Sequence, residues 1–177
     1  NIIKLSPLEM SENDSYYNPL FIAKDGTEIR EMAQLIMTNG NKSVELATGS
    51  SSGGAEWLNM ATPLLSATLA YVKEKGERKT INEALDIILK DDLKMMEKRF
   101  ESVPSALRSF LIFKSSAGSE KTLSSIKSVL TTNMQLFVDE KIEDFTQTPF
   151  IKNALGEKVV DKRKMFNPNV LREKPTV

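Results

Sequence analysis

Apolar residues recur every three or four positions through most of this chain, which is the spacing of one face of an α-helix. The first such stretch predicts a helix over 25–39. Asp25 and Glu28 have the spacing of a capping box at its start, and Gly40 is expected to end it. The polar stretch that follows, "NKSVELATGSSSGG", is expected to form a loop.

Five further helices are predicted after this loop. The first covers 55–75, where Pro63 is expected to bend the helix and Gly76 to end it. The others are expected to begin at the capping box "TINE", after Asp91 and Asp92, near Pro104 and near Ser119. The fold class expected is therefore all-α, a bundle of about six or seven helices joined by short loops.

The two ends of the chain have a different character from its centre. The helical domain is expected to span 25–145, between an extended segment at 1–24 and a basic extended segment at 146–177. The last of these holds seven lysines or arginines against three acidic residues. Because "NIIKL" and "REKPTV" are strand-like, the helical part is expected to be an insertion whose two ends meet in one sheet of a larger protein.

The amino-acid composition excludes several kinds of binding site and catalysis. The 177 residues are 40% hydrophobic and 27% charged, as in a folded globular domain. Lysine and arginine total 24, as do aspartate and glutamate, so no overall positive field attracts nucleic acid. The lack of cysteine and histidine excludes disulfides, thiol catalysis, a Ser-His-Asp triad and a histidine zinc site. The longest apolar stretch, around 61–72, is shorter than the ~20 residues of a membrane span, so the piece is expected to be soluble.

The run of glycine and serine from Gly49 to Gly54 leads straight into a helix, as phosphate-binding loops do. Such a loop also needs a preceding strand and a lysine followed by serine or threonine, and this stretch offers neither. The sequence "AGSEKT" at 117–122 fails the same test and is interpreted as a loop and helix cap. We therefore expect no nucleotide binding or hydrolysis, no cofactor and no catalytic residue in this segment.

Other candidate sites have structural explanations. Asp91, Asp92 and the acidic residues of 139–144 are interpreted as solvated helix caps rather than metal ligands. Met95, Met96 and Met134 fall at helical spacing and are expected to fill the core, the alternative being an adaptable binding groove.

Four stretches together carry a resemblance to a known family: "YYNPL" at 16–20, "AEWLNMATPLLSATLAYV" from Ala55, "TLSSIKSVLTTNMQLF" from Thr122, and the closing "KPTV". In their order along the chain they resemble the all-alpha domain of the coupling proteins of conjugative and type IV secretion systems, the VirD4 and TraG family. The resemblance implies that the parent protein is a membrane-anchored hexameric ATPase that brings relaxase-bound DNA to the secretion channel. This domain would then lie at its cytoplasmic base and select the substrate. The stretch "TGSSSGG" departs from the family pattern.

Two classes of function are compatible with these features. The first is a module that recognises a protein, either the relaxase or a relaxosome accessory protein, which the neutral charge and the uncharged helical surface favour. The second is a helical DNA-binding module, which "KEKGERK" at 73–79 and the basic C-terminal segment favour. A solvated helix end is the alternative interpretation of "KEKGERK", because glutamates interrupt its lysines.

The partner site is predicted at the end of the bundle far from the two chain ends. Alternating helix directions would gather three loops there: 40–54, the junction at Asp91 and Asp92, and 115–120. Trp57 is either a packing anchor or a partner contact. The candidate partner-binding residues are Asn41, Lys42, Ser50, Ser51, Ser52, Trp57, Lys114 and Lys121.

Overall fold

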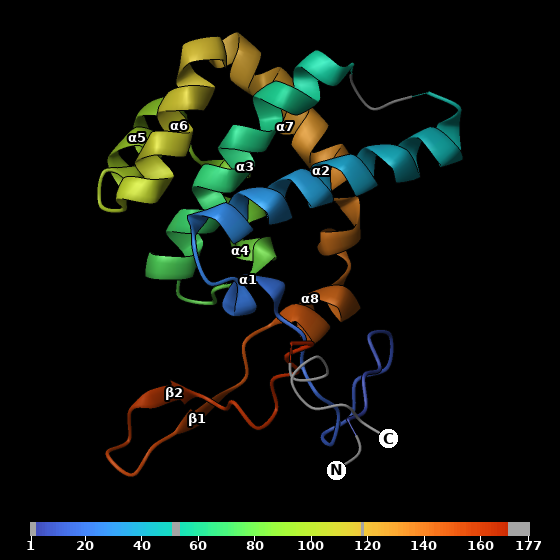
Figure 1. Ribbon diagram of the computed structural model, residues 1–177, viewed down its shortest axis with the longest axis vertical. Helices are drawn as coiled ribbons and strands as arrows, with labels where there is room; N and C mark the ends of the chain where they lie inside the picture. The colour runs from blue at the N-terminus through green and yellow to red at the C-terminus, as the bar shows by residue number, and fades with distance from the viewer. Residues whose placement is uncertain (1–2, 51–53, 118, 170–177) are drawn as a thin grey trace.

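A computed structural model describes residues 3–50, 54–117 and 119–169 of the chain. The described part is mostly helical, as Figure 1 shows, with one short 3-10 helix, η1, and a single β-hairpin. In chain order the elements are α1 (Pro19–Ile22), α2 (Gly26–Thr48), α3 (Ala55–Lys75), α4 (Ile81–Lys90), α5 (Leu93–Phe100), α6 (Pro104–Ala117), α7 (Glu120–Asn133), η1 (Gln135–Val138), α8 (Glu140–Thr146), β1 (Phe150–Lys152) and β2 (Lys158–Val160).

The all-α prediction is confirmed, with eight α-helices among the described residues instead of six or seven. The two additional helices, α1 and α8, are too short to give a periodic apolar pattern. Polar caps define them instead: the Asn18 side chain accepts a hydrogen bond from Phe21 N, and Asp139 caps α8 in the same way.

Helix α3 is the centre of the core. Every residue from Leu64 to Ala70 is buried, so the helix is enclosed on all sides by its neighbours. It packs against α2, α4, α5, α6 and α7. Small residues allow these neighbours to come close, and the buried Thr68 satisfies its hydroxyl by donating to Leu64 O at 2.9 Å. The prediction that methionines fill the core is confirmed for Met96 and Met134 and is wrong for Met95, which lies 51% exposed on α5.

Two predicted capping boxes are half confirmed. Asp25 and Thr80 cap α2 and α4 by accepting backbone N–H groups, as expected. The reciprocal bond differs in both cases: Glu28 accepts from Lys24 N at 2.7 Å, and Glu83 accepts from the backbone of residues 77–79. The carboxylate therefore fixes the chain before the cap and not the cap residue itself.

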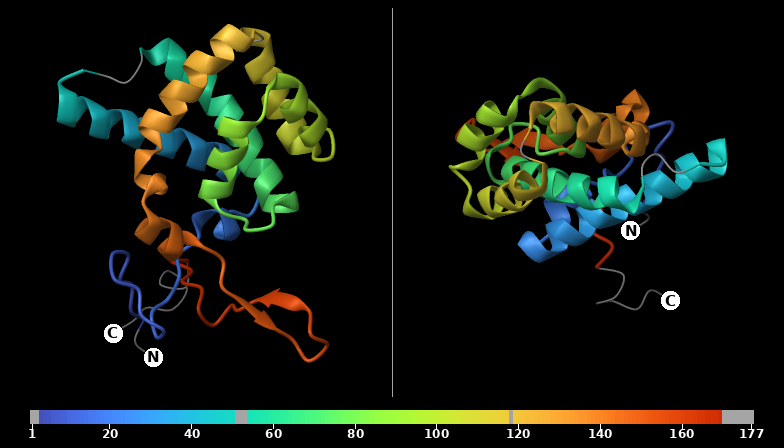
Figure 2. Two further views of the ribbon diagram at one scale, coloured as in Figure 1. Left: turned by 180° about the vertical axis from the view of Figure 1, so that it is seen from behind. Right: turned by 90° about the horizontal axis from the view of Figure 1, so that it is seen from above.

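The predicted end of α2 at Gly40 is wrong, and so is the loop predicted over 41–48. The helix runs on to Thr48, and Gly49, with φ of 72°, ends it in the left-handed conformation. Gly40 serves a different purpose, because α7 crosses α2 at this point. A Cβ atom placed on Gly40 would lie 2.1 Å from Asn133 O, so only glycine permits this close approach. Beyond the crossing, α2 extends away from the body, as Figures 1 and 2 show.

The segments on either side of the helical body lie together. Tyr16 N donates to Lys164 O and Phe166 N donates to Tyr16 O, both at 2.8 Å. This parallel bridge joins Tyr16 and Met165, while β1 and β2 form a separate antiparallel hairpin that projects from the body in Figure 1. The strand predicted in "NIIKL" is absent from its described residues, 3–5, and "REKPTV" lies outside the described residues. None of the helices in the described part of the chain is long and apolar enough to cross a bilayer.

Replacing Gly40 with alanine tests the close approach of α2 and α7. Alanine normally stabilises a helix interior by about 1 kcal/mol relative to glycine. Here we expect destabilisation by about 1–3 kcal/mol, because the methyl group forces the two helices apart. Urea unfolding followed by circular dichroism measures the change. Gly26→Ala is the control, since nothing lies within 4 Å of its added Cβ, and a Gly40→Ala variant as stable as Gly26→Ala would contradict the packing described.

Candidate functional site

Asn18, in the "YYNPL" stretch, connects three parts of the chain. Its side chain is fully buried. The Nδ2 group donates to Lys79 O and to Thr148 Oγ1, both at 2.8 Å, while Oδ1 accepts from Phe21 N at 3.1 Å. One side chain thus fixes the start of α1, the turn between α3 and α4, and the segment after α8. We call these contacts the Asn18 clasp.

Neighbouring contacts strengthen the clasp. Tyr17 packs its ring against Phe145 and Phe166, with centroids 6.3 and 6.1 Å away. Arg78 pairs with Glu143 of α8 at 2.7 Å. Lys73 donates to the carbonyl groups of Leu20 and Ala23 at the end of α1, and partial burial lowers the pKa of its ammonium group. The clasp therefore holds α1 and α8 at fixed positions on the helical body.

A groove with a volume of ≈ 1210 Å³ lies beside the clasp. One wall is the face of α2 from Glu28 to Thr48, and the opposite wall runs from Thr132 at the end of α7 through η1 to Asp139. Residues around α1 and Pro168 close one end. The Asn82 side chain of α4 donates to Phe137 O, which fixes η1 against the body.

The groove presents apolar side chains to solvent. Leu35 on α2 is 61% exposed and Leu136 on η1 is 65% exposed, and they stand on opposite walls. Between them, Met32, Ile36 and Phe137 are half-buried and pack against the core. Exposed apolar surface gathered in a concave site is typical of a binding site rather than of a solvated face.

Carboxylates dominate the charge of the groove. Among the described residues, Glu28, Glu31 and Asp139 line it together with one cation, Lys24. Glu28 accepts from Lys24 N, and Asp139 caps α8 by accepting from Lys141 N at 2.9 Å. Glu31 is exposed and makes no hydrogen bond or ion pair within the described residues, so its charge is open to a partner.

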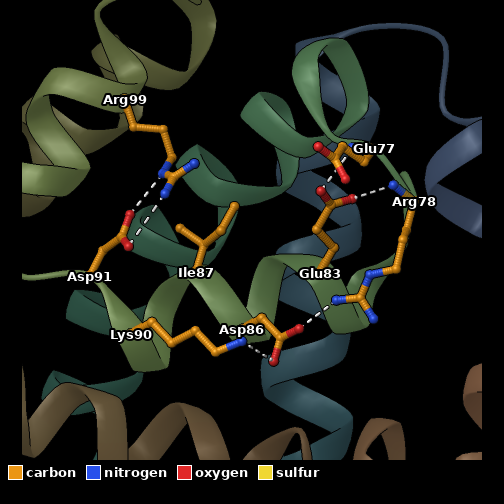
Figure 3. A pocket seen from close by; sticks show the side chains of 8 residues that line it. All are labelled: Glu77, Arg78, Glu83, Asp86, Ile87, Lys90, Asp91 and Arg99. Carbon is orange, nitrogen blue, oxygen red and sulfur yellow. Dashed lines mark hydrogen bonds and ion pairs between the residues drawn. The ribbon is translucent and has the colours of Figure 1, made fainter.

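A second, smaller pocket of ≈ 270 Å³ lies between the α3–α4 turn and α5, and Figure 3 shows its charged lining. Its cations are already paired. Arg99 donates to Asp91 at 2.7 Å, which raises the pKa of the guanidinium, while Arg78 and Lys90 both pair with Asp86. We interpret this pocket as a site of structural ion pairs: one group ties the α3–α4 turn to α4, and the Arg99–Asp91 pair ties α5 to the end of α4.

The two aspartates at the α4–α5 junction have different roles. Asp92 caps α5 by accepting from Met95 N, as predicted. The prediction of a solvated cap is wrong for Asp91, which is only 3% exposed, because its carboxylate faces Arg99 inside the smaller pocket. Within the described residues, no group of three acidic, histidine or cysteine side chains is placed to hold a metal ion.

The structure disperses the partner residues predicted from sequence. Asn41 and Lys42 lie within α2 instead of in a loop, and Ser50 follows the end of α2, exposed. Figures 1 and 2 show this end of α2 well separated from the α6–α7 turn near Lys121. Ser51 and Ser52 lie outside the described residues.

The other two predicted contacts are engaged inside the fold. Trp57 occupies the first turn of α3 as expected, and its half-buried ring packs against the core. Lys114 of α6 pairs with both carboxylate oxygens of Glu97 at 2.8 Å. The groove residues Leu35 and Leu136 were missed by sequence reasoning. The signal for Leu35 was the run "LIM" in α2, an apolar face wider than one core contact requires.

The comparisons with known proteins place this groove-bearing helical module in a family. A family model described as type IV secretory system conjugative DNA transfer matches residues 1–162. The chain therefore belongs to that family, as the resemblance had indicated. No curated protein and no solved structure matches the chain.

Replacing Asn18 with alanine tests the clasp. The substitution removes the donor of the buried Thr148 Oγ1 and of the part-buried Lys79 O, and we expect it to lower the free energy of unfolding by roughly 3 kcal/mol. Urea unfolding measures the loss. Asn59→Ala, at an exposed position on α3, is the matched control and is expected to change stability little. Equal stability of the two variants would show that the Asn18 contacts do not stabilise the fold.

Proposed function

We propose that this chain is the substrate-recognition part of a coupling protein in a type IV conjugative DNA transfer system. In this proposal the groove between α2 and η1 docks the relaxase or a relaxosome accessory protein. The observation that carries it is the exposed apolar lining of the groove, in a chain whose family acts in conjugative DNA transfer. Such a lining has little use unless another surface covers it.

The chemistry of the groove favours a protein over DNA as the direct partner. Glu28, Glu31 and Asp139 would repel phosphate groups, and Lys24 is the one lysine among the lining residues that the structure describes. Apolar side chains such as Leu35 and Leu136 contribute nothing to phosphate binding, whereas they suit an apolar protein side chain.

The proposal concerns one part of a larger machine. We assign this chain no catalytic residue, cofactor or metal, and we assign nucleotide hydrolysis to other parts of the parent protein. That parent would be a membrane-anchored hexamer with this domain on the cytoplasmic face of the cell membrane. The Asn18 clasp would then transmit the position of the flanking segments to α1 and the groove.

A second candidate function, direct DNA binding, rests on the segment from β1 to Lys164. It carries five basic side chains: Lys152, Lys158, Lys162, Arg163 and Lys164. Lys158 lies 4.2 Å from the centre of the Phe150 ring, and Arg163 pairs with Asp161 at 3.0 Å. The stretch "KEKGERK" gives less support, because its Lys73 and Arg78 are engaged within the fold.

The docking proposal is tested with the double variant Leu35→Asp/Leu136→Asp. Both side chains are exposed, so the fold is expected to survive while binding of purified relaxase or accessory protein falls at least about tenfold. Surface plasmon resonance measures the affinity and circular dichroism checks the fold. Leu111→Asp/Ile112→Asp on α6 is the matched control, because these side chains are 49% and 60% exposed and lie outside the groove. Unchanged binding by the groove variant would refute the docking site.

The DNA alternative makes a separate prediction. If the basic segment binds DNA, Lys158→Glu/Lys162→Glu/Lys164→Glu should weaken binding of a single-stranded oligonucleotide and reduce its salt dependence by about two to three ion equivalents. Fluorescence anisotropy over a range of salt concentrations measures both quantities. An affinity that depends equally on salt in the variant and the original chain would rule out this segment as the DNA contact.

A further inference from the structure

The occupant of the groove can be described more closely than as a protein surface. We propose that it is an amphipathic α-helix with basic side chains beside its apolar stripe, and that its basic end lies next to the N-terminal half of α2. This inference rests on the proposed docking function and specifies the chemistry of the partner segment.

The length of the groove fits a helix. Its α2 wall runs from Glu28 to Thr48, which corresponds to about 30 Å at the rise of an α-helix. A helix of about five turns spans that face, and the opposite wall, from Thr132 to Asp139, borders the part of it up to the α7 crossing at Gly40. Lining residues on α2 recur at intervals of three and four, so the wall is one straight helical face against which a second helix can pack.

The backbone of the walls also favours a helix over an extended segment. An extended peptide needs a free strand edge to pair its N–H and C=O groups. None of the groove-lining residues in the described part of the chain belongs to β1 or β2; the long wall is α2, and the shorter one consists of the end of α7, η1 and Asp139. A helical partner brings its own backbone hydrogen bonds and needs only side-chain contacts.

Large apolar side chains from both walls gather at one end of this length, while Val44 and Ala47 line the other end on α2 alone. Met32, Leu35 and Ile36 face Leu136 and Phe137 across the groove near α1. They offer a depression for two or three apolar side chains spaced by three or four residues on the partner helix. Methionine adapts its shape easily, which suits a surface that receives side chains of several sizes.

The charges of the groove lining indicate which charge the partner helix carries and in which direction it lies. The carboxylates Glu28, Glu31 and Asp139 lie at the same end as the apolar depression. Toward the far end the lining is uncharged, with the polar Asn39, Ser43 and Thr48 beside Val44 and Ala47. Lysine or arginine flanking the apolar stripe would therefore be attracted to one end only.

Three synthetic peptides of about 18 residues test the inference, each labelled with a fluorophore. The first has leucines on one helical face and lysines beside them in one half. The second replaces these lysines with glutamate, and the third keeps the lysines but places proline in the centre. We expect the 177-residue chain to bind the lysine peptide at least about tenfold more tightly than either of the others at low salt. Fluorescence anisotropy measures the affinities.

Two single substitutions on α2 locate the charge effect. Glu31→Lys should weaken binding of the lysine peptide about threefold, because it reverses the open charge of the groove. Glu45→Lys makes the same change at an exposed position of α2 outside the lining and is expected to leave binding unchanged. An equal effect of both variants would overturn the assignment to the groove.

The remaining outcomes separate this inference from the docking proposal. Equal affinity for the lysine and glutamate peptides, or full binding of the proline peptide, would overturn the basic helix. In that case, loss of relaxase binding in Leu35→Asp/Leu136→Asp would still support the groove as a docking site. If sedimentation shows that the same double variant only disrupts a dimer of the chain, a second copy is the occupant and the inference is wrong.

Discussion

The buried side chain of Asn18 is the contact on which the arrangement of this structure depends. Its two donor bonds and one acceptor bond satisfy backbone and hydroxyl groups that lie far apart in the sequence. Lys79, whose carbonyl receives one of these bonds, has a φ of 55°, so the α3–α4 turn is held in a conformation that few non-glycine residues adopt. The clasp thus adds a buried polar contact to the Tyr16–Met165 bridge and the Tyr17–Phe166 ring contact, which also join the segment before α1 to the segment after α8.

The groove follows from the clasp and from one close helix crossing. The clasp fixes the end of the groove near α1, and Gly40 brings α2 onto the end of α7. Between these two points α2 is held against the body on one side only, so the opposite side of its wide apolar face remains open. Leu35 is exposed for this reason, and η1 provides Leu136 as the facing wall.

Local signals in the sequence were sufficient to predict most of the helices. Asp25, Thr80 and Ser119 each cap the helix that their spacing predicted, and Pro104 begins α6 as expected. The error at Gly40 shows the limit of such signals. Glycine ends many helices, but here its lack of a side chain is needed by α7, and that contact cannot be seen from local spacing.

The candidate site was harder to predict for the same reason. Sequence reasoning placed the partner contacts in polar loops, and one of those loops proved to be helix up to Thr48. A groove depends on which two faces the fold brings opposite each other, and no periodic pattern links Leu35 to Leu136. The burial of Asp91 could not be predicted from its local sequence either, since it depends on Arg99, eight residues further along the chain.

Site-specific photo-crosslinking in conjugating donor cells tests the central claim most directly. A photoreactive phenylalanine analogue would replace Leu35 in the parent protein, and the same analogue at Leu111 and at Ser50 would serve for comparison. The account predicts an adduct with the relaxase or a relaxosome accessory protein from position 35 and none from position 111. Adducts from position 111 or position 50, with none from position 35, would contradict the groove as the docking site.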